Sequence, residues 1–102
     1  IIAARVKELN TRAALSKKNL CIRDRGMCQY CSVNISLQHG TVDHVIPKSK
    51  GGSHNWENVV WSCARCNQMK GNKLPREFHL KLSKPPRIPT IYDVINFRSI
   101  KL

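Results

Sequence analysis

Apolar residues recur at helical spacing at the start of the chain. Ile2, Val6 and Leu9 fall on one face of a helix, and charged residues occupy the positions between them. This spacing predicts a helix over residues 2–10. The charged positions then point away from whatever the apolar face covers.

A second short helix is predicted a few residues later. Ser16 is typical of the residue that precedes a helix, because its hydroxyl accepts a hydrogen bond from a free backbone N–H. The helix should run to about Asp24 and end before Gly26. Residues 1–26 are thereby predicted to form a helical segment with a basic face, made of Lys17, Lys18, Arg23 and Arg25.

The pattern changes to that of strands in the middle of the chain. Residues 41–46 are rich in β-branched side chains, and Pro47, which has no backbone N–H, should end the strand there. Residues 59–61 predict a second strand, antiparallel to the first if the two form a hairpin. A helix is then expected from about Ala64 to Gly71, a typical residue just past a helix end. The expected fold class is therefore a small α+β domain.

The last part of the chain carries weaker signals. Pro75 suits the start of another short turn of helix, and residues 84–89 contain three prolines, which favours an extended segment. Apolar residues between Ile91 and Phe97 predict one more element that packs on the domain. We treat residues 76–102 as an extension that packs on the core or projects from it.

Composition narrows the class of protein. The 102 residues fit one small domain, and the net charge of +12 with a pI near 10.0 favours binding to a polyanion, although a basic surface that is merely solvated would explain the same charge. No run of about 18 apolar residues predicts a membrane span, and Arg5 and Lys7 interrupt the apolar start, so we expect no signal peptide. Because the chain begins at Ile1, we expect a piece of a longer protein.

Five cysteines indicate a metal site rather than a disulfide framework. The number is odd, and two Cys-x-x-Cys pairs are typical of zinc ligands in a reducing compartment, so we expect a cytoplasmic protein. Four thiolates would complete a tetrahedral zinc site with sulfurs about 2.3 Å from the ion and no open position, which makes the zinc structural. Four unrelated cysteines are the alternative. Cys21 is left over and should be buried. The ligands would be Cys28, Cys31, Cys63 and Cys66.

Polar residues between the cysteine pairs suggest a second metal site. Asp43 and His44 are adjacent near the end of a predicted strand, and Asn67 follows the last zinc cysteine directly. Carboxylate and amide oxygens suit Mg²⁺ or Mn²⁺, and a neutral histidine can take a proton from water. A base for the nucleophile and a metal for the leaving oxygen are what hydrolysis of a phosphodiester requires.

Each of these residues also has a simpler interpretation. His44 alone would more often be a packed histidine, Asn67 and Asp43 would be capping residues, and Asn58 would be a turn residue. Their occurrence together between two zinc ligand pairs favours a site. His39 and His54 lie in predicted loops, where we expect no direct role.

The combined pattern resembles the HNH endonuclease family with its ββα-metal (His-Me finger) motif, in the bacterial and phage subgroup that carries a four-cysteine zinc. The resemblance covers about half of the chain and places the core at residues 27–75. The residues that carry it are Cys28-Gln29-Tyr30-Cys31, Asp43-His44-Val45-Ile46-Pro47, Gly51-Gly52, Asn58, Cys63, Cys66-Asn67 and Lys70-Gly71-Asn72.

The resemblance implies a metal-dependent endonuclease or nickase. His44 would be the general base, Asp43 and Asn67 would hold one divalent ion, and Asn58 would brace the loop and orient His44. Asn67 stands where the family has its name-giving histidine, which favours Mg²⁺ or Mn²⁺ over zinc or nickel in that site. The expected products carry 5′-phosphate and 3′-hydroxyl ends.

The expected partner is DNA, most simply double-stranded, with no membrane and no small-molecule cofactor. One alternative is a zinc module that binds nucleic acid without cutting it. Another is a zinc knuckle that binds protein, with the charge serving solubility. The residues expected to contact phosphates are Arg23, Arg25, Lys48, Arg65, Lys70 and Lys73.

Overall fold

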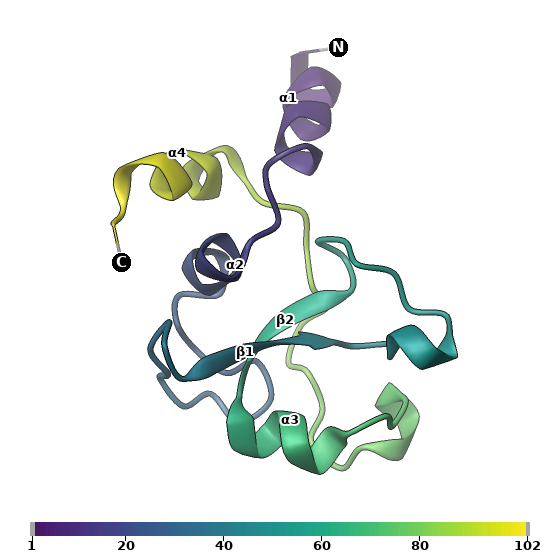
Figure 1. Ribbon diagram of the computed structural model, residues 1–102. Helices are drawn as coiled ribbons and strands as arrows, with labels where there is room; N and C mark the ends of the chain where they lie inside the picture. Colours follow the sequence, from purple (N-terminus) through teal and green to yellow (C-terminus); the bar gives the residue numbers. More distant parts are fainter. Residues whose placement is uncertain (1, 102) are drawn as a thin grey trace.

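The computed structural model describes the backbone of residues 2–101 and the side chains of residues 5–101. It contains a two-stranded sheet with helices on both sides and at both ends, which confirms the α+β class (Figure 1). The helices and strands are α1 (Ile2–Thr11), α2 (Lys17–Arg23), β1 (Gly40–His44), β2 (Val59–Cys63), α3 (Ala64–Lys70) and α4 (Ile91–Ser99).

The predicted helices form, but the first contributes less to the core than its apolar spacing suggested. The Ser16 hydroxyl accepts the N–H of Asn19 at 3.1 Å, so α2 begins as expected. In α1, however, Leu9 is 60% exposed, and the side chain of Ile2 lies outside the described residues. The helix extends away from the hairpin beside α4, so it adds little to the main core (Figure 1).

The two strands pair antiparallel as predicted. Asp43 lies opposite Val60 and His44 lies opposite Val59. The first strand ends at His44, two residues earlier than expected, although the N–H of Val45 still donates to the carbonyl of Asn58 at 2.8 Å. The chain leaves its partner strand only after Val45, so His44 lies near the end of the strand pair.

The second strand is buried on both faces. Val59 and Trp61 pack with Leu20 of α2, whereas Val60, between them, packs with Cys66 of α3. Successive strand residues point to opposite faces, so each face of β2 supplies one of two small cores. The hairpin is thus held between α2 on one side and the cysteine-rich segment with α3 on the other (Figure 1).

The position of Arg23 differs from the one expected from the sequence. Arg23 was expected to bind phosphate, but it is 3% exposed and its guanidinium donates to the backbone carbonyls of Trp56, Val59 and Arg87 at 2.7 to 2.8 Å. It also forms an ion pair with Asp24 at 2.8 Å. The planar guanidinium carries five donors, which suits it to tie several carbonyls together. Arg23 fastens α2 to the hairpin and to the C-terminal segment.

This arrangement predicts a large loss of stability on removal of the guanidinium. Arg23→Leu should lower the free energy of unfolding by roughly 3–5 kcal/mol, because Asp24 would be left buried without its cation. Urea denaturation of the zinc-loaded protein measures the change. Arg25→Leu is the matched control, since Arg25 is exposed, and should change stability by less than about 0.5 kcal/mol. Equal effects of the two substitutions would contradict this account.

None of the helices in the described part of the chain combines the length and apolar character needed to cross a bilayer.

Candidate active site and metal centre

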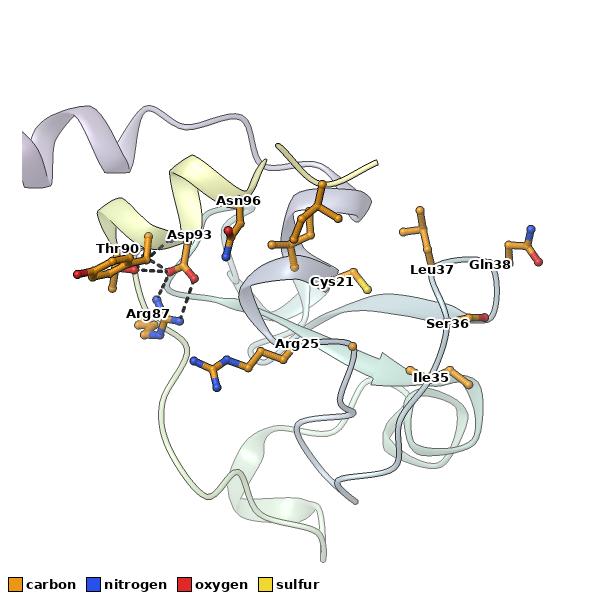
Figure 2. Close-up of a pocket in the computed structure, with 14 residues that line it drawn as sticks. Cys21, Arg25, Ile35, Ser36, Leu37, Gln38, Arg87, Thr90, Asp93 and Asn96 are labelled. Carbon is orange, nitrogen blue, oxygen red and sulfur yellow. Dashed lines mark hydrogen bonds and ion pairs between the residues drawn. The ribbon is translucent and has the colours of Figure 1, made fainter. Parts of the chain in front are cut away.

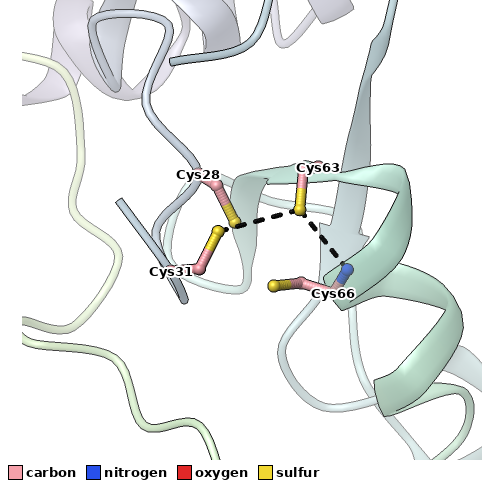
Figure 3. Close-up of side chains that lie close together, drawn as sticks. All are labelled: Cys28, Cys31, Cys63 and Cys66. Atoms are coloured by element: carbon pink, nitrogen blue, oxygen red, sulfur yellow. Dashed lines mark hydrogen bonds between the residues drawn. The ribbon is translucent and has the colours of Figure 1, made fainter. Parts of the chain in front are cut away.

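The four cysteines of the two Cys-x-x-Cys pairs come together at one point (Figure 3). Cys28 and Cys31 lie in the turn after α2, whereas Cys63 ends β2 and Cys66 lies in α3. Their sulfur atoms are all within 4.8 Å of one another. Sulfurs about 2.3 Å from a tetrahedral zinc ion lie about 3.8 Å apart, and the Cys31 and Cys63 sulfurs are 3.8 Å apart. The cluster fits zinc and uses every position of a tetrahedral site.

The electrostatics of the cluster also favour a cation. Burial raises the pKa of the Cys28 thiol, but backbone N–H groups of Cys63, Cys31 and Tyr30 lower it to about 7. Burial and the neighbouring thiols instead raise the pKa of Cys66. Four thiolates this close repel one another unless a metal neutralises them. Zinc would therefore act as the ion that holds the knuckle, β2 and α3 together.

Asn67 and Asp43 lie on the same side of the hairpin. The amide nitrogen of Asn67 donates to the Thr41 hydroxyl at 2.8 Å. Thr41 is two residues before Asp43 in β1, and residues two apart in a strand share a face. Since its nitrogen is engaged, the oxygen of the Asn67 amide is the atom it offers to a cation. The structure brings these residues to one face through Thr41.

Asp43 is held by a buried polar network. Its Oδ2 accepts a hydrogen bond from the Tyr30 hydroxyl at 2.5 Å and lies 3.3 Å from Lys70 Nζ. Asp43 is 5% exposed and Lys70 is 1% exposed. Burial, followed by the hydrogen bond to Asp43, raises the pKa of Tyr30, so the phenol stays protonated and donates. With Oδ2 engaged, Oδ1 is the oxygen of Asp43 that remains to bind a metal.

Lys70 is the second basic residue whose position differs from the expected one. It was expected to contact phosphate, but its ammonium group is buried, where it pairs with Asp43 and donates to the carbonyl of His44 at 2.8 Å. Lys70 lies three residues after Asn67 in α3, so the two share a helix face. That face is turned toward β1 rather than toward solvent, so Lys70 braces the two adjacent residues of the candidate site.

The buried ion pair gives a second prediction about stability. Lys70→Met should lower the free energy of unfolding by roughly 3 kcal/mol, because it leaves the Asp43 carboxylate buried without its cation. Lys73→Met, at an exposed lysine one turn away, should have little effect. Adding Asp43→Asn to Lys70→Met should recover part of the loss in urea denaturation, since the unpaired charge is then gone. If the double variant is less stable than Lys70→Met alone, the ion pair is not the cause.

His44 lies at the end of β1 with its imidazole half-buried. Burial lowers its pKa, and the nearby Lys48 and His54 lower it further. The neutral form of His44, which accepts a proton, is therefore more populated near pH 7. The Nε2 atom of His44 lies 2.9 Å from Nδ1 of His54, so Nδ1 of His44 is the nitrogen left for other contacts.

Asn58 holds the loop that follows His44. It is 7% exposed, and its side chain accepts the N–H of Ile46 at 2.9 Å while donating to the carbonyls of Ile46 and Ser53. Gly52 passes so close that a Cβ there would collide with the Ile46 carbonyl oxygen. Asn58 thus bridges the two sides of the loop.

The other expected phosphate contacts are on the surface. Lys48, Arg65, Lys73 and Arg25 are all exposed. Lys48 is near enough to His44 to influence its pKa. These residues remain available to a polyanion, in contrast to Arg23 and Lys70.

A large cavity lies away from these residues. It has a volume of about 940 Å³ and lies between α2, residues 35–38 and α4, beside the ion pair of Arg87 and Asp93 (Figure 2). None of Asp43, His44 and Asn67 lines it. This cavity is therefore separate from the candidate site at the end of β1.

Comparison with known proteins identifies the family. The sequence model of a family described as HNH endonuclease matches residues 28–83, which is more than half of the chain and includes both cysteine pairs. This chain belongs to the HNH endonuclease family. The matched residues of the HNH domain also include Asp43, His44, Asn58 and Asn67.

Two bacterial relatives of this HNH domain are much longer proteins. The CRISPR-associated endonuclease Cas9 of Corynebacterium diphtheriae is 40% identical over 63 residues, which are 61% of this chain and 6% of that protein. The Cas9 of Actinomyces naeslundii is 39% identical over 46 residues, or 44% of this chain and 4% of that protein. The chain therefore spans only a small part of the length of these relatives.

A solved structure has the same fold as this HNH domain. The crystal structure of the Type II-C Cas9 enzyme from Actinomyces naeslundii matches 96% of this chain and 14% of its own, with a TM-score of 0.56 and 16% sequence identity. At this identity the likeness concerns the fold alone. It agrees with the small α+β architecture described above.

Three residues near the HNH site were not assigned to it from the sequence. Tyr30 lies between two zinc ligands, and a buried tyrosine hydroxyl needs a partner, which signals a contact such as the one with Asp43. Thr41 could have been found from strand alternation, being two residues before Asp43. His54 offers no such signal, because a glycine-containing loop separates it from His44.

Proposed function

We propose that this HNH domain hydrolyses phosphodiester bonds in double-stranded DNA, with His44 as the general base and one Mg²⁺ or Mn²⁺ ion held by Asp43 and Asn67. The observation that carries the proposal is the arrangement at the end of β1. A half-buried histidine with a lowered pKa follows a carboxylate with one free oxygen, and α3 brings an amide beside the same strand.

Each residue of the site has a separate role in the proposed reaction. Nδ1 of His44 takes a proton from the attacking water, which makes the water a better nucleophile. Asp43 Oδ1 and Asn67 Oδ1 are the oxygens that would hold the ion. A bound divalent ion supplies charge stabilisation for the scissile phosphate and for the 3′ oxygen as it leaves. Lys70 keeps Asp43 and the His44 backbone in fixed relative positions.

The charge of the chain supports DNA as the partner. A net charge of +12 attracts the phosphate backbone, and Arg25, Lys48, Arg65 and Lys73 are exposed and available for phosphate contacts. Both relatives are named endonucleases, which supports cleavage within a strand. A reducing compartment such as the bacterial cytoplasm would keep the four zinc thiols reduced.

Cleavage of a supercoiled plasmid tests the proposal. The zinc-loaded protein with Mg²⁺ or Mn²⁺ should convert it to the nicked form, and DNA ligase should reseal the nicks, because ligase requires a 5′-phosphate beside a 3′-hydroxyl. His44→Ala should leave the plasmid intact. If the wild type leaves the plasmid intact in the presence of either ion, or if ligase cannot reseal the nicks, the proposed chemistry is wrong.

One observation favours the alternative of a DNA-binding module that does not cut. Asp43 is 5% exposed and its Oδ2 already has two partners, so it has less capacity to bind an ion than an exposed carboxylate. Mn²⁺ titration followed by electron paramagnetic resonance separates the two functions. The endonuclease should bind Mn²⁺ in a manner that Asp43→Asn weakens, whereas the alternative predicts DNA binding with no Mn²⁺ site.

A further inference from the structure

In the described part of the chain, the imidazole of His54 lies within hydrogen-bond distance of a ring nitrogen of His44. His44 Nε2 and His54 Nδ1 are 2.9 Å apart, and the ring centroids are 5.1 Å apart with the planes tilted by 41°. Two neutral imidazoles at this distance share one hydrogen, so one ring donates and the other accepts. The contact therefore links the protonation of one ring to that of the other.

The shared hydrogen fixes which nitrogen of His44 is free. If His44 donates through Nε2–H, its Nδ1 has a lone pair and can accept a proton from water. If His54 donates through Nδ1–H, then His44 carries its proton on Nδ1 and cannot act as a base there. The first arrangement keeps both rings in the Nε2–H form, which is the more stable form of a neutral histidine in water. It is therefore the favoured one.

The loop that carries His54 is fastened on both sides of that residue. The Asn58 side chain donates to the carbonyl of Ser53 at 2.7 Å, directly before His54. Directly after it, Asn55 donates through its side chain to the Ser53 hydroxyl at 2.6 Å and accepts the N–H of Asn58 at its carbonyl at 2.9 Å. His54 is exposed, yet these bonds hold its backbone beside His44.

We propose that His54 is a positioning residue for the general base: it accepts the Nε2–H of His44, fixes the tautomer and turns Nδ1 toward the attacking water. The inference rests on the proposed function, and it changes the role expected of Asn58. Asn58 was expected to brace the loop and orient His44. In this proposal Asn58 acts on His44 indirectly: it anchors Ser53, the residue before His54, and His54 contacts His44.

Three variants test this role in the zinc-loaded protein. His54→Leu removes the acceptor, and His54→Asn restores one, because an asparagine oxygen lies close to where the histidine Nδ1 was. His39→Leu is the matched control, since His39 is also an exposed loop histidine but lies before β1, at the opposite end of that strand from His44. Zinc content and circular dichroism establish that each variant is folded.

The expected result has two independent parts. In single-turnover plasmid cleavage with Mg²⁺, His54→Leu should be about 10- to 100-fold slower at unchanged DNA affinity. His54→Asn should recover most of the rate, and His39→Leu should match the wild type. In long-range ¹H–¹⁵N spectra, His44 should show the Nε2–H form in the wild type and in His54→Asn, and a mixture of tautomers in His54→Leu.

The two parts separate failure of this inference from failure of the proposed function. If the wild type cleaves, His44→Ala does not, and His54→Leu cleaves as fast as the wild type, the inference is overturned while the proposed function stands. If the wild type does not cleave, the spectra decide: a His44 tautomer unchanged by His54→Leu overturns the positioning role, and a changed tautomer supports it. A His54→Asn variant as slow as His54→Leu also counts against it.

Discussion

Removal of the zinc is expected to unfold the domain. A structural zinc site of cysteines contributes roughly 10–16 kcal/mol of apparent binding free energy, whereas a small domain has a total stability of about 5–15 kcal/mol. Here Cys28, Cys63 and Cys66 are themselves members of one of the two cores. Treatment with a strong zinc chelator should therefore abolish the dispersion of amide signals in ¹H–¹⁵N spectra, and added zinc should restore it.

The fifth cysteine supplies the control for this experiment. Cys66→Ser should lose both the zinc and the folded structure, since it removes one of the four ligands. Cys21→Ala should keep zinc and a dispersed spectrum, because Cys21 is a buried residue of α2 and lies outside the cluster. A chelator that removes the metal completely while the spectrum stays native would contradict a structural role for the zinc.

His44→Ala is expected to abolish cleavage without disturbing the fold. Loss of a general base typically costs a factor of about 10²–10⁴ in rate. The side chain is half-buried at the end of a strand, so its removal should change the melting temperature little. Single-turnover cleavage measures the rate, and fluorescence anisotropy with a labelled duplex should show unchanged affinity.

His39→Ala serves as the comparison, because it removes a histidine from the surface without touching the candidate site. It should cleave as fast as the wild type. If His44→Ala keeps more than about a tenth of the wild-type rate, His44 is not the general base. If it loses DNA affinity in parallel with the rate, its role is in binding.

Local patterns predicted most of the core of this domain. The Cys-x-x-Cys spacing fixes which sulfurs meet, and a ligand pair on each side of the hairpin brings β2 and α3 to the first knuckle. Asn67 follows Cys66 directly, and the structure brings its side chain to Thr41 of β1. Such predictions succeed because each depends on residues close together in the sequence or joined by one metal.

The sequence could not distinguish buried basic residues from exposed ones. Arg23 and Lys70 share their charge with Arg25 and Lys73, yet only the first two are buried. The partners that bury Arg23 lie far away in the sequence, as far as Arg87. No local pattern specifies such contacts, and charge alone favoured a phosphate partner for all of these residues.

The contact between His44 and His54 could not be predicted from the sequence for a related reason. The loop between them contains Gly51 and Gly52, and glycine allows many paths for the backbone. The path taken depends on Asn58, whose side chain bonds to both sides of the loop. The position of His54 is therefore set by tertiary hydrogen bonds rather than by sequence spacing.

The structural zinc and the divalent ion proposed for catalysis have separate roles, and one titration tests this directly. Zinc-loaded protein is freed of loosely bound ions on a chelating resin, and plasmid cleavage is measured as Mg²⁺ or Mn²⁺ is added, with zinc counted by mass spectrometry before and after. One zinc per chain should remain throughout, with no cleavage before addition and a saturable rise afterwards. Full cleavage with no added ion, or none at any concentration while zinc and plasmid remain bound, would contradict the account.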